Sequence, residues 1–278
     1  MGPDAARDMT LSDTHRQQLA QARSLLENPG LTARLSDALA SPVERGMAYL
    51  PAGAREQIVA LSDAALRAAL RVALSTLDDA RSPPSNRLHK IGGALSGALG
   101  GAFGLPALAA ELPVSTSIML RSIADIARSE GEDLADAEAR IACMEVFALG
   151  GRSSSDNAAE SGYFAVRAAL ARTVSDAVRY AATAGAVKET APAMVRLIAQ
   201  VATRFSIPVT EKAAAQAIPA VGAAGGAIIN VLFLDHFQAM AQGHFTVRRL
   251  ERRYGPSAVQ AAYGALPLHV EARPPRAD

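Results

Sequence analysis

The chain has 278 residues, of which 50% are hydrophobic but only 4% aromatic, and tryptophan is absent. This length is enough to bury a substantial core, and apolar content made mostly of alanine, leucine, valine and isoleucine favours close-packed helices. The 28 basic and 27 acidic residues nearly cancel. This balance argues against a nucleic-acid partner, because such binding normally needs an excess of positive charge.

The single cysteine, Cys143, excludes an intrachain disulfide framework and a cysteine-rich zinc site. It lies in the apolar segment 141–149 with no histidine nearby, which is typical of a buried small side chain rather than a nucleophile. Residues 1–9 contain no apolar run and do not resemble a secretory signal. We therefore expect a cytoplasmic protein.

Two helices are predicted in the N-terminal third of the chain. Apolar residues from Leu11 to Leu26 predict a helix that ends before Asn28-Pro29-Gly30. Residues 55–77 carry an apolar side chain at every third or fourth position, which is typical of a helix with one buried face. This helix should end before Pro83-Pro84, because consecutive prolines deny a helix its hydrogen bonds.

The next part of the chain is dominated by uncharged segments. Residues 91–110 carry no charge, nor do the residues from 112 to 120, and a second uncharged run covers 213–234. Between them the apolar spacing predicts helices at about 134–149, 159–184 and 191–205, and no segment shows sustained period-two alternation. The sequence therefore predicts an all-α protein.

We expect one multi-helix bundle with ends of different character. Residues 1–54 are assigned to an N-terminal helical extension, and residues 55–266 to the main helical domain. Residues 267–278 contain consecutive prolines and are expected to form a loose tail.

Small residues recur at four-residue steps in both uncharged runs: Gly93, Gly97 and Gly101 in the first, and Gly222, Gly226 and Asn230 in the second. A glycine inside a helix costs about 0.5–1 kcal/mol relative to alanine, and this cost is offset where a second helix needs to approach closely. Pro106 and Pro113 are predicted to break the first run. We therefore expect two glycine-rich apolar helical hairpins that pack together, with Asn230 forming a hydrogen bond at their crossing.

Three interpretations of the first run stay open: a buried core, permanent membrane insertion, and a bundle that opens onto a membrane. Its strong apolar residues contribute only roughly −2 to −4 kcal/mol on an insertion scale, which makes insertion marginal. Arg87 and Lys90 precede the run and would mark a cytoplasmic flank if it did insert. The expected location is accordingly cytoplasmic, either peripheral to the inner membrane or partly inserted in it.

The sequence contains no serine-hydrolase elbow, no zinc-protease motif and no phosphate-binding loop. Asp235, His236 and His244 are candidate metal ligands on one predicted helix. The two imidazoles would project about 80° apart around that helix, which does not suit a shared ion. We therefore predict neither a metal nor a cofactor.

Charged residues beside the first uncharged run are candidates for a polar site. Glu111, Arg121 and Asp125 would each be costly to bury without a partner. One interpretation is an ion pair that fixes the hairpin, and the other is a ligand site that also includes Asn230 and His244. Both are kept open.

Four arginines near the C-terminal end form a second candidate site: Arg248, Arg249, Arg252 and Arg253. Such a cluster is usually a solvated helix face. If it faces a membrane, it would attract anionic lipid headgroups by roughly 1 kcal/mol per basic residue.

The sequence resembles the EcsC family of bacterial proteins from about Leu61 to Tyr263. The resemblance is carried by the glycine-rich run ending at Pro106 and by these further segments: Arg121-Ser-Ile-Ala-Asp-Ile-Ala, Gly131-Glu-Asp, Ser161-Gly-Tyr-Phe-Ala-Val-Arg167, Ile218-Pro-Ala-Val-Gly-Ala-Ala-Gly-Gly with Asn230, and His244-Phe-Thr-Val-Arg-Arg-Leu-Glu-Arg-Arg-Tyr-Gly255. The family is named after a gene in an operon that encodes an ABC transporter. The resemblance thus implies a membrane transporter component as a partner, and it supplies no catalytic residues. The "peptidase" label that some members carry has no matching constellation in this sequence.

We expect a non-enzymatic, membrane-proximal accessory or lipid-contacting protein, with anionic lipid as a partner and oligomerisation compatible with the sequence. The first alternative is a peptidase-like hydrolase, which predicts a pocket lined by at least three of Glu111, Arg121, Asp125 and His244. The second alternative is a soluble protein-interaction module.

Overall fold

The computed structural model describes residues 11–27, 31–39, 43–76, 104–151, 162–185, 187–218 and 222–266. Within these ranges every regular element is a helix: α1 (Asp13–Glu27), α2 (Leu31–Leu39), α3 (Val43–Met47), α4 (Ala54–Thr76), α6 (Gly104–Ser129), α7 (Ala137–Leu149), α8 (Gly162–Ala184), α9 (Pro192–Ala217), α10 (Gly222–Tyr254) and α11 (Pro256–Ala265). The prediction of an all-α fold is confirmed. Two predicted helix ends are also confirmed: α1 ends at Glu27, as its apolar spacing and the following turn residues predict, and α8 ends at Ala184.

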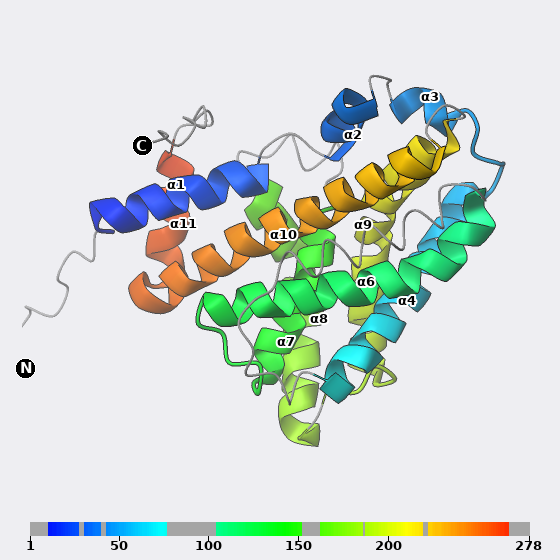
Figure 1. Cartoon of the computed structure of the whole chain (residues 1–278). Coiled ribbons are helices and arrows are strands. Elements are labelled where there is room, and N and C mark those ends of the chain that lie inside the picture. Colours follow the sequence, from blue (N-terminus) through cyan, green and yellow to red (C-terminus); the bar gives the residue numbers. More distant parts are fainter. Residues whose placement is uncertain are drawn as a thin grey trace, which may run out of the picture.

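Helix α7 lies at the centre of the molecule and packs against α6, α8, α9 and α10 (Figure 1). Every residue from Ile141 to Leu149 is buried. A helix that is apolar on all sides needs neighbours on all sides, which explains this central position. Phe147 of α7 makes an edge-to-face contact with Phe205 of α9 at a centroid distance of 5.0 Å, and a tilted contact with Phe237 of α10 at 5.4 Å.

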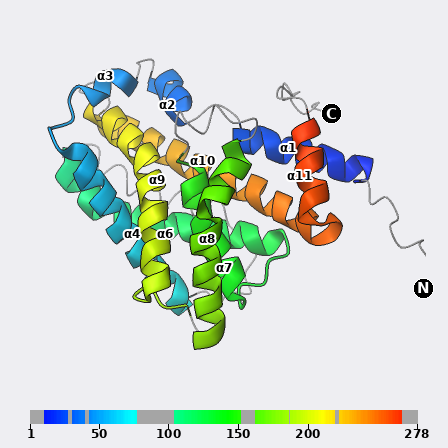
Figure 2. The ribbon, with the colours of Figure 1, turned by 180° about the vertical axis from the view of Figure 1, so that it is seen from behind.

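Helix α10 is the longest described element and runs along most of the bundle (Figure 1). Helices α1 and α11 lie at its C-terminal end in both views (Figures 1 and 2). Its crossing with α1 depends on Gly243, where an added Cβ would lie 2.6 Å from Leu26 Cγ and 3.0 Å from the Ala22 carbonyl oxygen. A small residue therefore permits one close helix crossing, at a position outside the predicted glycine series.

The predicted break between Pro106 and Pro113 is wrong, because α6 continues through Pro113 to Ser129. Likewise α9 continues through Pro208 to Ala217, beyond its predicted end at Phe205. A proline inside a helix removes one hydrogen bond and crowds one carbonyl, and packing on the remaining faces can compensate. At Pro208 the crowded carbonyl belongs to Arg204, and Gly151 lies so close to it that an added Cβ would be 1.9 Å from the oxygen.

The N-terminal helices are part of the same core as the rest of the bundle. Leu19, Leu35 and Val43 are fully buried in it, and α1, α2 and α3 contact α9 or α10. The predicted boundary at residue 54 therefore does not separate two cores.

The predicted glycine hairpins stay a prediction. Gly93, Gly97 and Gly101 lie outside the described residues. The second uncharged run is divided between the end of α9 and the start of α10, where Gly222 is the first helical residue and Gly226 is buried. Among the described helices, none combines the length and the apolar character that crossing a membrane requires.

Candidate functional site

Glu111 of α6 forms a buried ion pair with Lys212 of α9, with Oε1 and Nζ 2.5 Å apart. The Lys212 ammonium also lies 4.8 Å from the centroid of the Phe233 ring. Burial lowers the pKa of Lys212, and the Glu111 carboxylate opposes that shift. Glu111 thus has a buried basic partner, Lys212, that was not identified from the sequence.

The other predicted polar-site residues are dispersed. Asp125 accepts a hydrogen bond from Arg128, one turn along the same helix, at 3.1 Å. Arg121 is exposed, whereas Asn230 is buried beside a very small cavity of about 10 Å³ that Ser115 and Phe233 also line. These residues share no large pocket in the described part of the chain.

His244 of α10 is fully buried, and its Nδ1 shares a hydrogen bond of 3.0 Å with the Tyr163 hydroxyl of α8. Burial, helped by Arg167 and Arg248, holds the pKa of His244 well below its ordinary value, so the ring is neutral near pH 7. His236 is also buried and pairs with the Gly150 carbonyl at 3.0 Å. The part of the chain that the structure describes contains no cluster of three potential metal ligands.

Three of the four arginines predicted as a lipid-headgroup patch are engaged within the protein. Arg248 binds Glu132 at 2.8 Å and Glu138 at 3.2 Å, Arg249 binds Glu130 at 2.7 Å, and Arg252 binds Glu132. Arg253 is exposed, with its guanidinium over the Tyr254 ring. The three paired arginines attach α10 to the end of α6 and the start of α7, so their charge is largely neutralised.

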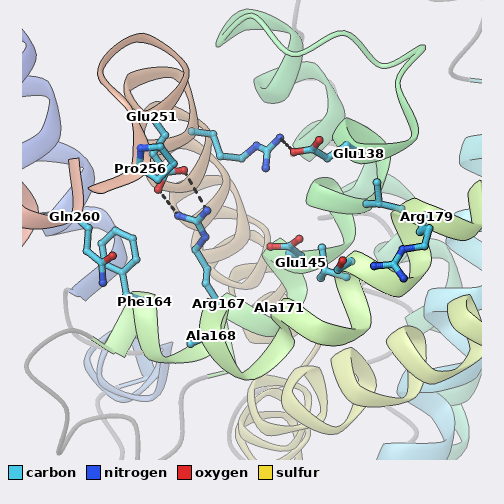
Figure 3. Close-up of a pocket in the computed structure, with 14 residues that line it drawn as sticks. Glu138, Glu145, Phe164, Arg167, Ala168, Ala171, Arg179, Glu251, Pro256 and Gln260 are labelled. Carbon is cyan, nitrogen blue, oxygen red and sulfur yellow. Dashed lines mark hydrogen bonds and ion pairs between the residues drawn. The ribbon is translucent and has the colours of Figure 1, made fainter. Parts of the chain in front are cut away.

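A cleft of about 630 Å³ lies between α7, α8, α10 and α11 (Figure 3). The charged residues that line it are Glu138 and Glu145 from α7, Arg167 and Arg179 from α8, and Arg248 and Glu251 from α10. The apolar residues that line it come mainly from α8: Phe164, Ala168, Ala171, Val174 and Val178. Its volume falls within the range of about 300–1,000 Å³ that is typical of small-molecule sites.

Glu145 is the most deeply placed carboxylate of this cleft, and only 7% of the residue is exposed. Figure 3 shows its carboxylate among the lining side chains, between Arg167 and Glu138. It forms no hydrogen bond or ion pair with any described residue. Burial raises the pKa of Glu145 to about 7, because the loss of hydration outweighs the attraction of Arg167 and Arg248.

The arginines near Glu145 are bound to other carboxylates. Arg167 donates two hydrogen bonds to Glu251, at 2.7 and 3.1 Å, and a longer one of 3.3 Å to the Tyr163 hydroxyl. Arg248 is held by Glu132 and Glu138. This geometry fixes both guanidinium groups on the cleft wall and leaves Glu145 as a carboxylate without its own basic partner among the described residues.

Two faces of α8 are apolar, and only one of them enters the core. Tyr163, Val166 and Leu170 are buried in the bundle, whereas the adjacent face, which includes Phe164 and Ala171, lines the cleft. This second face was not predicted, because the apolar spacing of residues 159–184 indicates a helix without distinguishing its faces. Glu145 was not predicted either, and its signal in the sequence is a single charge inside the apolar segment 141–149.

The cleft between α7, α8, α10 and α11 is not the pocket that the hydrolase alternative requires. None of Glu111, Arg121, Asp125 and His244 lines the cleft. His244 lies behind its wall and contacts Tyr163, whose hydroxyl accepts from Arg167.

Three segments that carry the family resemblance come together beside the cleft. Glu132, from the segment Gly131-Glu-Asp, pairs with Arg248 from the segment 244–255. Arg167, from the segment 161–167, pairs with Glu251 of that same segment 244–255. The EcsC protein family matches residues 13–250, which is most of the chain. Comparisons with curated proteins and with solved structures gave no match. On the extent of the family match, the chain belongs to the EcsC protein family.

Proposed function

We propose that this EcsC-family chain is a non-enzymatic accessory protein that acts at the membrane surface and holds one amphiphilic molecule in the cleft between α7, α8, α10 and α11. The observation that carries the proposal is the division of the cleft into an apolar wall on α8 and a charged floor formed by residues of α7 and α10 together with Arg167 of α8. A molecule with an apolar chain and a polar head matches both surfaces at once.

The apolar wall is only partly covered in the isolated chain, although Phe164, Val174 and Val178 also pack against the core. Ala168 and Ala171 are exposed, and Phe164, Val174 and Val178 are only half-buried. Covering such side chains gains roughly 25 cal/mol per Å² of apolar surface removed from water. A bound alkyl chain would provide that cover along consecutive turns of one helix.

The charged floor would orient the head of the same molecule. Arg167 and Glu251 form an ion pair with each other, and Arg248 is paired with Glu132, so the floor is formed before a ligand arrives. Such preorganisation reduces the entropic cost of binding. Lipid is therefore the partner that we propose first, and a membrane transporter component is a further proposed partner that rests on the family resemblance.

The proposal is tested by calorimetric titration of the full chain with 1-decanol, an uncharged amphiphile, as the dissolved monomer. We expect saturable binding. Ala171→Trp should weaken it at least tenfold, because the indole would fill the middle of the cleft. Since the chain has no native tryptophan, the emission of the new indole also reports its burial.

Ala182→Trp is the matched control, because Ala182 is an exposed alanine of α8 that does not line the cleft. It should bind 1-decanol as the unaltered chain does. The proposal fails if the unaltered chain does not bind, or if the two tryptophan variants bind equally well.

A further inference from the structure

We infer that the cleft selects amphiphiles whose head is a primary ammonium group, and that the Glu145 carboxylate is the residue that recognises it. This inference rests on the proposed function, since it names the chemical class of the ligand for the same cleft. The supporting observation is a carboxylate that is 93% buried, lines the cleft and has no partner among the described residues.

A carboxylate in that position requires a positive partner when it is ionised. Taking it out of water without one is costly, and a cation that donates hydrogen bonds removes most of the cost. Glu138 and Glu251 do not have this need, because Arg248 and Arg167 already bind them. Glu145 is therefore the residue of the cleft floor at which binding of an external cation is most favourable.

An anionic head is a poorer match to the same floor. Arg167 uses both terminal nitrogens in its hydrogen bonds with Glu251 and Tyr163, and Arg248 is held by two glutamates. A phosphate or sulfate would compete with these glutamates for the two guanidinium groups and would be repelled by an ionised Glu145. Arg179, the remaining lining arginine, is exposed at the edge of the cleft.

A divalent metal ion is also a poorer match than an ammonium group. Such ions prefer several carboxylate or imidazole ligands, and the described residues contain no cluster of three candidate ligands. One carboxylate beside an apolar wall suits a head with N–H donors and an attached alkyl chain.

The test compares decylammonium, 1-decanol and decyl sulfate as monomers binding to the full chain. We expect decylammonium to bind at least tenfold more tightly than 1-decanol, and decyl sulfate to bind most weakly. Glu145→Gln should remove the advantage of decylammonium and leave the affinity for 1-decanol within about threefold, where tenfold corresponds to 1.4 kcal/mol.

Glu138→Gln is the matched control, because Glu138 is another cleft glutamate two turns earlier on α7 that already has Arg248 as a partner. It should retain the preference for decylammonium. Equal binding of decylammonium and 1-decanol by the unaltered chain would overturn the inference while leaving the proposed function intact. If the unaltered chain binds none of the three decyl compounds, both the inference and the proposed function are overturned.

The ammonium group could belong to a phospholipid or to a free amine, and vesicle flotation distinguishes these sources. The vesicles contain phosphatidylcholine, whose quaternary ammonium has no N–H donor, with or without phosphatidylethanolamine. Retention that requires both phosphatidylethanolamine and Glu145 would assign the head to a lipid. If decylammonium is preferred but such retention is absent, the source is a free amine.

Discussion

Glu111 on α6 and Glu145 on α7 are both more than 90% buried, yet their surroundings differ. Glu111 faces Lys212 at 2.5 Å inside the bundle, so each of the two charges has an opposite charge beside it within the protein. Glu145 has no such partner among the described residues, and it opens into a cleft of about 630 Å³. The difference teaches that a buried charge points to a ligand only where the protein leaves its pairing incomplete and leaves space beside it.

The largest loss of stability is expected when the ion pair between Glu111 and Lys212 is broken. Lys212→Met should lower the free energy of unfolding by about 3–5 kcal/mol, because it leaves Glu111 buried with no positive partner. Chemical denaturation measures the change, and adding Glu111→Leu should recover most of it. The control is Lys188→Met at an exposed position. A loss below about 1 kcal/mol would mean that the pair does not differ from an exposed one.

A smaller loss is expected on the wall of the cleft. Arg167→Met removes both hydrogen bonds to Glu251, whose side chain is only 10% exposed, and should cost about 2–3 kcal/mol. Arg172→Met, at an exposed position of the same helix, should change stability by less than about 0.5 kcal/mol. If the two variants have the same free energy of unfolding, the ion pair between Arg167 and Glu251 does not stabilise the wall of the cleft.

Glu145→Gln should raise the free energy of unfolding rather than lower it, by an amount that depends on pH. The pKa of Glu145 is raised from 4.5 to about 7 in the folded protein, so ionisation of this group opposes folding. The contribution of Glu145 to stability is therefore fully present below about pH 4.5, where the group is protonated, and it is lost as the pH rises through 7. The glutamine variant should therefore be more stable than the unaltered chain by about 1–3 kcal/mol near pH 8. Near pH 5 the two should be nearly equal. Thermal unfolding across this range measures the difference, and a variant that is less stable near pH 8 would contradict the unpaired state of Glu145.

The smallest effect is expected at the exposed end of the arginine cluster. Arg253→Ala should change the free energy of unfolding by less than about 0.5 kcal/mol, since Arg253 is exposed and contacts only the adjacent Tyr254 ring among the described residues. The measurement is chemical denaturation, combined with flotation on vesicles that contain anionic lipid. A marked loss of vesicle retention in this variant would favour the predicted headgroup patch over the cleft as the lipid-contacting surface.

Much of the fold could be predicted because local signals agree with it. The helix ending before Asn28 and the helix near residues 55–77 were both found from apolar spacing and from turn residues. The prolines were misjudged, since α6 and α9 continue through Pro113 and Pro208. A single lost hydrogen bond breaks an isolated helix more readily than one whose other faces are packed.

The candidate site was largely beyond the sequence. Arg248 and Arg252 were correctly noted as a cluster, but nothing in their spacing shows that Glu132 lies opposite. Pairing of Glu111 was expected, whereas Lys212, 101 positions away in the chain, was not identified. Contacts between distant segments depend on helix packing, which apolar spacing does not specify.

The amino-acid sequence by itself determined the helical class, the positions of α1, α4, α7 and α8, and the membership in the EcsC family, because these depend on local spacing and on motifs within short segments. Only the tertiary structure decided which charges of the site are paired, because Glu111–Lys212, Arg167–Glu251 and Arg248–Glu132 join residues far apart in the sequence. It also decided that one face of α8 is only partly covered and that Glu145 lies beside it. The ligand that we propose follows from that partly covered face and that unpaired charge together.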